Sequence, residues 1–337
     1  MDQQQHAVTP ERIMQFAWGF APPLVIEAGI RHKVFDALDA GPKTVEEVAA
    51  ATGASARGLR AIMNCLVGLE LLKKSDGKYE LTPESSTFLV TTKPSFFGGM
   101  VAHTSGQLMP PWLHISDVVK TGKPAAAVNL EGDGSAFFQE LVSNIFPMSY
   151  GAAQALAKHL NFGEAGGPVR VLDLGAGSGV WGIAVAQSSP RVEVTAVDWP
   201  AVLPIAQKTA AKFGLAERYK TVPGDLATAD FGRDYDVITI GHILHSEGVE
   251  RSKQLLRKCF DALAPGGTIA IQEFLVNADH TGPPMGVIFA VNMLINTENG
   301  DTWSFEEIAG WLKEVGFANP RLLEAPGPSP LILATKG

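Results

Sequence analysis

An aspartate and three glycines stand close together in the segment VRVLDLGAGSG, near the middle of the chain. The apolar residues predict a short buried strand that contains Asp173, and a helix is expected directly after the segment. Gly175, Gly177 and Gly179 fall in the turn between them. Glycine permits a tight turn and lets a ligand approach the main chain more closely than a Cβ would allow. A strand, a glycine turn and a helix in this order aim backbone N–H groups at a crevice, so these residues predict a small-molecule site.

Two classes of cofactor fit a glycine-rich turn of this kind. Gly182 completes the pattern G-x-G-x-x-G, which is the dinucleotide fingerprint, so NAD is one interpretation. Asp173, however, would face a bound pyrophosphate and repel it, whereas a carboxylate there suits a ligand with an ammonium group. The sequence D-x-G-x-G-x-G resembles the first motif of class I S-adenosylmethionine-dependent methyltransferases, whose cofactor has a free amino group and a sulfonium cation. The resemblance implies that S-adenosylmethionine is the cofactor.

Further acids follow the next two predicted strands. In an open α/β sheet, ligands bind beyond the carboxyl ends of the strands. Asp198 ends the second strand, where its carboxylate can accept hydrogen bonds from both ribose hydroxyls of an adenosine, and Trp199 can contact that adenosine. Asp225 ends the third strand and can accept from the adenine amino group, while Leu226 packs on the ring. An acid at Asp198 would serve NAD equally well, so it does not separate the two cofactors.

The fourth predicted strand ends in the segment IGHILHSE, which contains His245. With this segment the chain, over almost all of its length, resembles the plant and bacterial small-molecule O-methyltransferases that include the caffeate and hydroxyindole enzymes. The family's catalytic base is the histidine of a Leu-His-Asp-Trp segment, and the resemblance implies that role for His245. The two acids that flank the base in the family match Glu273 and Asp301.

The segment departs from the family's pattern at several positions. Ser246 and Glu247 replace the usual Asp-Trp, where the family has an aromatic contact to the cofactor. Gly241 stands where plant members commonly carry a lysine that contacts the adenosine, and we expect Gly241 to lie in the cofactor site. His242 is an alternative base, because residues three apart can share one helix face. The family match alone favours His245.

Methyl transfer from a sulfonium needs an aligned nucleophile and removal of its proton. A phenol with a pKa of about 10 is mostly protonated at neutral pH, whereas an imidazole with a pKa of about 6.5 can accept its proton. General-base help is worth roughly 10²–10⁴ in rate, and a carboxylate on the second ring nitrogen fixes the tautomer and stabilises the imidazolium. Glu273 and Asp301 are the candidates for that carboxylate. No metal is needed, and we expect no metal site because no His and Asp cluster with ligand spacing is visible.

The sequence says less about the acceptor. An aromatic and methionine-rich stretch that includes Phe146 could form a wall for a flat apolar substrate. Met293 and Asn296 match the helix that lines the family's acceptor pocket, and Asn296 could hydrogen-bond a substrate hydroxyl. We therefore expect an O-methyltransferase of a small aromatic or polyketide-like metabolite. Three alternatives stay open: methylation at nitrogen, sulfur or carbon; cofactor-dependent decarboxylation or hydroxylation; and a winged-helix regulator that senses a metabolite.

Strands and helices alternate through the second half of the chain. The expected strands are residues 169–174, 192–197, 219–222, 236–240 and 267–274, and the expected helices are residues 180–187, 201–213 and 249–263. This alternation predicts a parallel α/β sheet. After a helix at residues 305–315, strands at 321–324 and 331–335 are joined so closely that they must be antiparallel. That ending is the arrangement of class I methyltransferases, so we expect a Rossmann-like methyltransferase domain over residues 166–337.

The first part of the chain is predicted to be mostly helical. Thr44 and Glu47 form a capping box at the start of one helix, a second helix follows Ser55, and a hairpin turns at Asp76-Gly77. Helix, turn, helix and hairpin describe a winged helix. Acids and bases are about balanced there, which argues against DNA binding.

Apolar repeats at residues 10–38 predict N-terminal helices with few partners close in sequence. We expect these helices to be buried in a homodimer. The expected domains are a winged-helix dimerisation domain at residues 1–115 and a helical linker that contributes to the substrate pocket at residues 116–165.

Charge and cysteine content bound the remaining possibilities. The 337 residues carry a formal charge of −8, and phosphate binding needs clustered Lys and Arg, so a general nucleic-acid partner is not expected. Cys65 and Cys259 lie far apart, which fits a reducing compartment. We find neither a signal-peptide pattern nor an apolar run of roughly 18–20 residues. These features predict a soluble cytoplasmic enzyme that contacts neither nucleic acid nor membrane.

Overall fold

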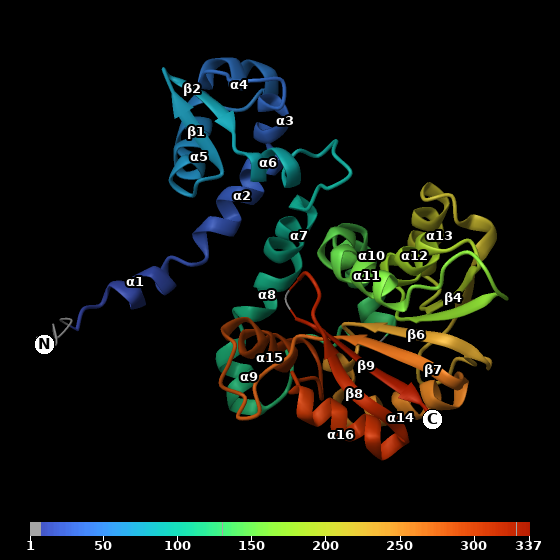
Figure 1. Ribbon diagram of the computed structural model, residues 1–337. Helices are drawn as coiled ribbons and strands as arrows, with labels where there is room; N and C mark the ends of the chain where they lie inside the picture. The colour runs from blue at the N-terminus through green and yellow to red at the C-terminus, as the bar shows by residue number, and fades with distance from the viewer. Residues whose placement is uncertain (1–7, 130, 328) are drawn as a thin grey trace, which may run out of the picture. The chain divides into compact units, whose positions relative to one another are not determined.

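The computed structural model describes residues 8–129, 131–327 and 329–337. The chain folds into two compact units, which divide between Leu108 and Met109 (Figure 1). The first unit is mostly helical, and the second is built around one large sheet. The fold class is therefore the expected one.

The first unit is a winged helix flanked by further helices. Its elements are α1 (Glu11–Ala17), α2 (Ala21–Arg31), α3 (Val34–Leu38), α4 (Val45–Thr52), α5 (Ala56–Gly68), β1 (Leu72–Ser75), β2 (Lys78–Leu81), α6 (Pro83–Phe88), α7 (Gly98–His103) and the π-helix η1 (Thr104–Leu108). α4 begins at the predicted capping box: the backbone N–H of Glu47 donates to Thr44 Oγ1, and the backbone N–H of Thr44 donates to Glu47 Oε2. β1 and β2 pair antiparallel across Asp76-Gly77. Apolar side chains of α3, α4, α5 and the hairpin form the core of this unit.

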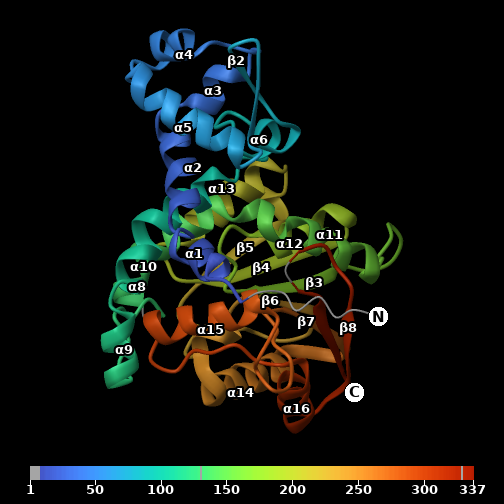
Figure 2. The same cartoon turned by 90° about the vertical axis from the view of Figure 1, so that its left-hand side faces the viewer.

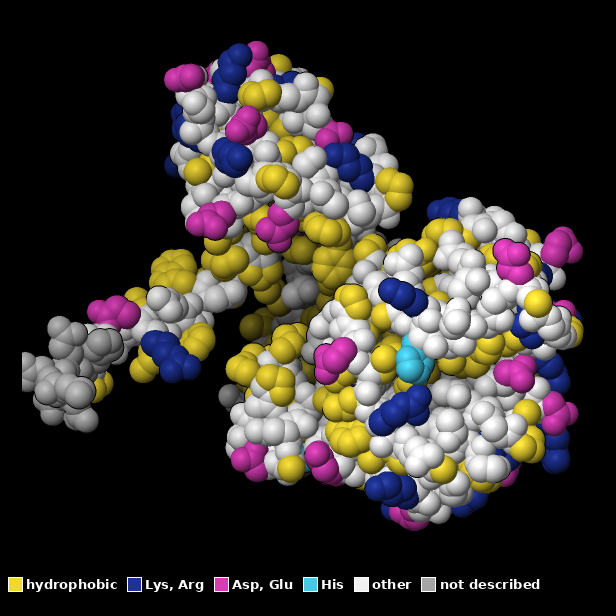
Figure 3. Space-filling model, in the orientation of Figure 1, with side chains coloured by type: hydrophobic (Ala, Val, Ile, Leu, Met, Phe, Trp, Pro, Cys, Tyr) yellow, Lys and Arg dark blue, Asp and Glu magenta, His cyan; other side chains and the backbone are white. Residues whose placement is uncertain are grey.

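The helices α1 and α2 and the turn between them carry apolar side chains that the first unit leaves exposed. These are Ile13, Met14, Phe16, Trp18, Phe20 and Leu24, and Figure 3 shows apolar side chains along this segment. By length and composition, Glu11–Arg31 is long and apolar enough to cross a membrane. That finding corrects the expectation that no run has this character. A turn at residues 18–20 divides the segment into two helices, and an exposed apolar face of this size marks an interaction surface.

The second unit begins with helices and continues as an α/β domain. Its elements are α8 (Met109–Trp112), α9 (Ile115–Thr121), α10 (Glu131–Asn144), α11 (Phe146–Leu160), β3 (Val169–Leu174), α12 (Val180–Ser188), β4 (Val192–Asp198), α13 (Leu203–Lys212), η2 (Ala216–Arg218), β5 (Tyr219–Pro223), β6 (Tyr235–Gly241), α14 (Leu244–Ala262), β7 (Leu263–Gln272), α15 (Pro284–Asn296), α16 (Phe305–Val315), β8 (Phe317–Leu323) and β9 (Leu331–Lys336).

The sheet has seven strands in the order β5-β4-β3-β6-β7-β9-β8. The first five are parallel, and β9 is antiparallel to both β7 and β8, as the sequence predicts. Three boundaries differ clearly from the prediction. β7 begins at Leu263, directly after α14, instead of at residue 267. β8 begins at Phe317, because Gly316 ends α16 and the chain enters the sheet at once. α14 begins at Leu244 and includes a non-helical Gly248 with φ +71°, so a short first turn precedes the expected helix.

Helices cover both faces of this sheet (Figure 2). One core lies between the sheet and α11, α12 and α13, and the other lies between the sheet and α14 and α16. The strands are apolar on both sides because both faces are covered. Because β3, β4, β5 and β6 are parallel, their carboxyl ends meet at one edge of the sheet. Ligands bind at this edge in open α/β sheets.

Candidate active site

The turn between β3 and α12 uses its glycines for conformations that other residues rarely adopt. The φ angle is +59° at Gly175, +55° at Gly177 and +80° at Gly179. A Cβ at Gly175 would collide with Ile243, and a Cβ at Gly179 would lie 2.6 Å from Tyr219 Oη. The turn therefore requires glycine for its own shape.

Asp173 lies beneath this turn and is fully buried. Its Oδ2 accepts from the backbone N–H of Gly182 at 2.9 Å, and its Oδ1 accepts from the Thr239 hydroxyl at 2.8 Å. Burial raises the pKa of this carboxyl to about 7, although both hydrogen bonds act to lower it. The sequence led us to expect that the carboxylate faces the ligand. Its oxygens instead join β3 to the start of α12 and to β6, because both of those elements pack against the end of β3.

Asp198 and Trp199 stand at the end of β4 beside the glycine turn. Asp198 is half-buried; its Oδ2 accepts from the backbone N–H of Gly177 at 2.8 Å and its Oδ1 accepts from that of Trp199 at 2.7 Å. Burial raises the pKa of Asp198 to about 6. The Trp199 ring packs edge-on against Phe138, with centroids 5.7 Å apart. The second predicted acid thus lies beside the turn, and its role in cofactor binding stays a prediction.

Asp225 and Leu226 begin the β5–β6 loop, the segment between those two strands. Asp225 Oδ1 accepts from the backbone N–H of Ala227 at 2.8 Å, and Leu226 packs against the core on the α14 side. Lys258 Nζ on α14 donates to the carbonyls of Leu226, Ala227 and Ala229 at 2.7, 3.0 and 2.9 Å. This lysine fixes the loop that carries Asp225. It was not predicted from the sequence, because a lysine on an amphipathic helix is ordinarily a solvated one.

Gly241, the last residue of β6, has a neighbour that explains the absence of a side chain. A Cβ there would collide with the indole nitrogen of Trp181, a buried residue in the first turn of α12. The lysine of plant members cannot be placed at this position unless Trp181 moves. Trp181 therefore accounts for the departure from the family's pattern.

His245 and Glu273 form a buried pair. The imidazole Nδ1 lies 2.8 Å from Glu273 Oε2, and the backbone N–H of His245 donates to Oε1 at 3.3 Å. Burial alone would raise the pKa of Glu273, but the neighbouring His245, its hydrogen bonds and His242 outweigh burial and leave this pKa below its ordinary value. An ionised carboxylate accepts a hydrogen bond from the Nδ1–H group. The ring proton therefore stays on Nδ1, and the lone pair lies on Nε2.

His242 lies next to this pair in a different environment. Its backbone is left-handed, with φ +60°, and its Nε2 lies 3.1 Å from Gln272 Oε1. Burial lowers the pKa of His242 to about 4, although Glu273 acts to raise it. No carboxylate is hydrogen-bonded to this ring within the described residues, so His242 lacks the partner that a general base needs to stabilise its charged form.

Two phenylalanines that were not singled out from the sequence surround the His245 ring. Phe289 meets it edge-on with centroids 4.9 Å apart, and Phe274 lies 6.2 Å away. The two phenylalanine rings lie 4.1 Å from each other. Phe274 follows Glu273 directly in the sequence, and Phe289 lies on α15 with the predicted Met293 and Asn296. Their closeness to these residues in the sequence could have identified both.

Asp301 reaches His245 through the main chain. Its backbone N–H donates to the His245 carbonyl at 2.9 Å, while its carboxylate accepts from the backbone N–H of Thr302 at 2.7 Å. The structure gives no hydrogen bond between this carboxylate and the imidazole. Of the two acids expected to flank the base, Glu273 alone is bonded to the ring.

The predicted acceptor residues fall in two places. Met293 and Asn296 are buried on α15, the helix that carries Phe289, and Asn296 Nδ2 donates to Asn292 Oδ1 at 3.0 Å. Asn296 Oδ1 is buried and has no hydrogen-bond partner among the residues that the structure describes. Phe146 instead stacks on Phe213, with centroids 5.6 Å apart. It therefore packs between the start of α11 and the end of α13.

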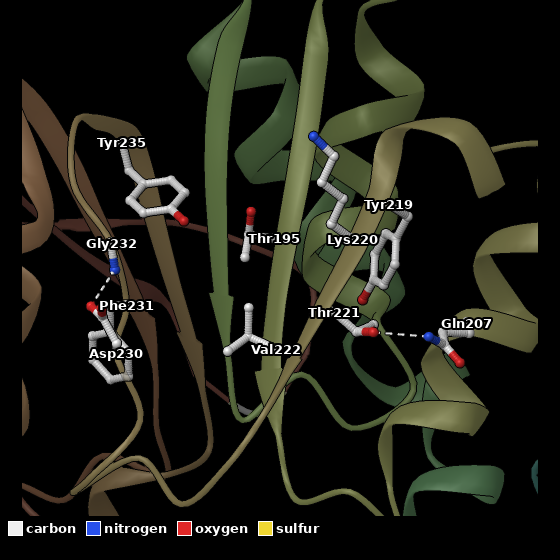
Figure 4. A pocket seen from close by; sticks show the side chains of 10 residues that line it. All are labelled: Thr195, Gln207, Tyr219, Lys220, Thr221, Val222, Asp230, Phe231, Gly232 and Tyr235. Carbon is white, nitrogen blue, oxygen red and sulfur yellow. Dashed lines mark hydrogen bonds between the residues drawn. The ribbon is translucent and has the colours of Figure 1, made fainter.

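A cavity of about 690 Å³ opens at the edge of the sheet beside β4 and β5 (Figure 4). It lies where the β5–β6 loop, with no helix of its own, covers the sheet. Its lining includes Thr195, Lys220 and Tyr235, and Gln207 Nε2 donates to Thr221 Oγ1 at its rim. None of the predicted site residues lines it, so it is separate from the His245 pair.

Comparison with known proteins assigns the chain to a family. Residues 14–91 match an O-methyltransferase dimerisation domain, and residues 153–318 match an O-methyltransferase domain. The 3-hydroxy-5-methyl-1-naphthoate 3-O-methyltransferase of Streptomyces sahachiroi is 29% identical over 336 residues, covering 97% of this chain and 95% of that protein. The tetracenomycin polyketide synthesis 8-O-methyl transferase TcmO of Streptomyces glaucescens is 24% identical over 341 residues, covering 100% and 99%.

A solved structure agrees with the sequence comparison. A candidate O-methyltransferase from Nostoc punctiforme has a TM-score of 0.89 at 29% identity, covering 98% of this chain and 100% of that one. Both the helical unit and the α/β unit are thus matched. The chain belongs to the S-adenosylmethionine-dependent O-methyltransferases with an N-terminal dimerisation domain.

Proposed function

We propose that this chain methylates a hydroxyl group of a small aromatic or polyketide-like metabolite, with His245 as the general base. The observation that carries the proposal is the buried hydrogen bond of 2.8 Å between His245 Nδ1 and the Glu273 carboxylate. The names of the two relatives, a 3-hydroxy-5-methyl-1-naphthoate 3-O-methyltransferase and an 8-O-methyl transferase of tetracenomycin polyketide synthesis, support an aromatic acceptor. The phenylalanine pair beside His245 supplies an apolar surface for such a ring.

The proposed reaction follows from the state of the His245 ring. S-adenosylmethionine supplies a methyl group on a positively charged sulfur when it is bound. Glu273 holds the proton on Nδ1, so Nε2 can accept the hydroxyl proton as the oxygen attacks. The same carboxylate stabilises the imidazolium that results. Phe274 and Phe289 pack around the ring and keep the charge pair in a poorly hydrated setting, which strengthens it.

His245 is favoured over His242 by its partner. His242 faces a neutral amide at Gln272, and its lowered pKa makes it a weak proton acceptor at neutral pH. Asp301 then acts as a positioning residue, since its main chain holds the carbonyl of His245.

The cofactor is proposed to lie across the carboxyl ends of β3, β4 and β5. The residues assigned to its site are Asp173, Gly175, Gly177, Gly179, Asp198, Trp199, Asp225, Leu226 and Gly241. The glycine turn fits this group because its left-handed residues carry no side chains that would keep a ligand away from the main chain. Asp198 would accept from the ribose hydroxyls and Asp225 from the adenine amino group, while Asp173 supports the turn from beneath.

The acceptor is proposed to lie against α15. Asn296 Oδ1 is a buried acceptor without a partner in the described part of the chain, and a substrate hydroxyl would satisfy it. Met293 lies on the same helix and can adapt to a flat ring. Phe146 is assigned only to an outer wall, because its ring is stacked on Phe213.

The N-terminal segment is proposed to hold two copies of the chain together. The match to a dimerisation domain and the exposed apolar side chains of α1 and α2 support a homodimer in the cytoplasm. We assign residues 1–115 to the dimerisation domain, 116–165 to the linker and 166–337 to the catalytic domain. Sedimentation of the wild type should give a dimer, and Phe16→Asp should shift it toward the monomer; a monomeric wild type would contradict the proposal.

His245→Ala tests the reaction. Methyl transfer should be lost while binding of S-adenosylmethionine, measured by calorimetry, persists. His280→Ala is the matched control, since His280 is an exposed histidine that also pairs with a glutamate, Glu307. Equal loss of binding and turnover would count against the base. The product mass separates the alternatives, because an added methylene marks methylation, whereas loss of carbon dioxide or gain of oxygen marks the other chemistries.

A further inference from the structure

Three metal-ligating side chains converge at the carboxyl ends of β6 and β7. One ligand atom from each of His242, His245 and Glu273 lies within 4.8 Å of the others. His242 follows β6, His245 lies in the first turn of α14, and Glu273 follows β7. Two imidazoles and one carboxylate suit zinc and its first-row neighbours, whereas magnesium and calcium prefer oxygen ligands alone. The sequence led us to expect no metal site, because this spacing matches no familiar ligand pattern.

The hydrogen bonds around Gln272 settle which nitrogen of His242 is available. Gln272 Nε2 donates to the carbonyl of Ser329 at 3.3 Å, so Gln272 Oε1 faces His242 as an acceptor. His242 Nε2 must then carry the ring proton, and the lone pair lies on Nδ1. Nδ1 is buried and has no hydrogen-bond partner within residues 8–129, 131–327 and 329–337. A buried lone pair without a donor is costly, and a metal ion would satisfy it.

The charge and size of the cluster also fit a cation. The Glu273 side chain is 2% exposed, so its carboxylate would be a buried anionic oxygen ligand for a cation. Two ligand atoms of a tetrahedral zinc ion lie roughly 3.4 Å apart, since each bond is about 2.0–2.2 Å long. The three ligand atoms lie within 4.8 Å of one another, so a contraction of at most about 1.4 Å would let them coordinate one ion.

We propose that His242, His245 and Glu273 bind a divalent cation of the zinc class, and that the bound cation inhibits methyl transfer. Coordination by His245 occupies either Nε2, which accepts the substrate proton, or Nδ1, whose bond to Glu273 orients the ring. Either mode removes the base. Binding of the ion is independent of the proposed function, whereas the inhibition rests on it.

Cobalt(II) alone is the probe, because its visible absorption reports nitrogen and carboxylate coordination without turnover. The full chain without an affinity tag should take up one cobalt ion with such a spectrum, and zinc should displace it. His242→Asn keeps a residue that tolerates positive φ and should weaken cobalt binding roughly 100-fold or more, because even outer-shell changes cost about 10–100-fold. Glu273→Gln should weaken it as well.

His280→Gln is the control, since His280 and Glu307 form an exposed histidine–carboxylate pair with only two ligands. This variant should bind cobalt as the wild type does. Absence of the spectrum in the wild type, or equal affinity of wild type and His242→Asn, would overturn the site. Thermal unfolding checks that each variant is folded. If cobalt binds but zinc does not inhibit methyl transfer, the site stands and the role of His245 as base falls.

Discussion

Replacement of Glu273 by glutamine tests the pairing on which the proposed function rests. The Glu273 carboxylate accepts from two donors of one residue, the imidazole Nδ1 at 2.8 Å and the backbone N–H of His245 at 3.3 Å. Glutamine offers one oxygen and one NH₂ group, so one of these donors must face another donor. If the oxygen takes the backbone N–H, the NH₂ group faces Nδ1. The ring then keeps its proton on Nε2, where it cannot accept one from the substrate.

The size of the effect depends on which donor the glutamine oxygen takes. If it takes Nδ1–H, the ring keeps its tautomer but loses the bond to a charged group; if it takes the backbone N–H, the ring adopts the wrong tautomer. A hydrogen bond to a charged group contributes about 1.5–3 kcal/mol, which corresponds to about 10- to 200-fold in rate at 1.36 kcal/mol per factor of ten. The wrong tautomer costs more, roughly 10⁴-fold when the aspartate of a Ser-His-Asp triad is replaced by asparagine. For Glu273→Gln we therefore expect kcat to fall by roughly 10²–10⁴.

The assay is transfer of a labelled methyl group at saturating cofactor and acceptor, with cofactor affinity measured separately by calorimetry. Asp301→Asn is the matched control, because the Asp301 carboxylate is bonded to Thr302 and meets His245 only through the main chain. Its kcat should stay within about tenfold of wild type. The reasoning is refuted if Glu273→Gln keeps kcat within about threefold of wild type, or if Asp301→Asn is the more damaging change.

Three further predictions concern the cofactor. The unliganded Asp198 has a pKa of about 6, and ribose hydroxyls favour its ionised form. Cofactor affinity, measured by calorimetry, should therefore rise about tenfold from pH 5 to pH 7.5. Asp198→Asn should abolish that rise. Lys258→Met should free the β5–β6 loop and so weaken cofactor binding about tenfold, while kcat at saturating cofactor stays nearly unchanged. Lys253→Met removes only a surface ion pair and should change neither quantity. Gly179→Ala should lower the free energy of unfolding by about 1–3 kcal/mol in denaturant titration and weaken cofactor binding, more than Gly266→Ala, which has a similar φ but open space around its Cβ.

The raised pKa of Asp173 predicts a separate effect, on the stability of the fold. An acid whose folded pKa lies above its unfolded value stabilises the fold at low pH and loses that contribution as the pH rises through the folded value. For Asp173 the window runs from its ordinary pKa of 3.8 to about 7. The unliganded protein should therefore lose stability across that range, and Asp173→Asn should reduce the loss, because its amide can accept from Gly182 and donate to Thr239. A thermal melting series between pH 5 and pH 8 measures this.

The element order could be predicted because each strand is an apolar run that is bounded by turn residues. The antiparallel ending followed from the short connection before residue 331, and the capping box at Thr44 appears as expected. The start of α14 could not be predicted, because Gly248 interrupts the helical backbone while the chain is helical on both sides of it. Hydrophobic periodicity reports such a break as an end.

The acids at strand ends were located by sequence, but the direction of their side chains was not. Asp198 and Asp173 both precede a turn, yet the first lies beside the glycine turn and the second lies beneath it. The difference depends on whether a neighbouring element supplies donors, which for Asp173 are Gly182 and Thr239. Lys258 was missed for the same reason, since its three carbonyl partners lie about thirty positions away along the chain.

For the two histidines, the sequence identified the residue type correctly but not the direction of the side chains. A shared helix face was the reason to treat His242 as an alternative base, but His242 precedes α14 and has a φ of +60°. Its ring consequently faces Gln272 rather than continuing the face that carries His245, with ring centroids 6.3 Å apart. The left-handed backbone is uncommon for a histidine and is maintained only if the surroundings stabilise it. It leaves Nδ1 buried and without a hydrogen-bond partner in the described part of the chain, so the conformation that separates His242 from the face of His245 also underlies the metal site that we propose.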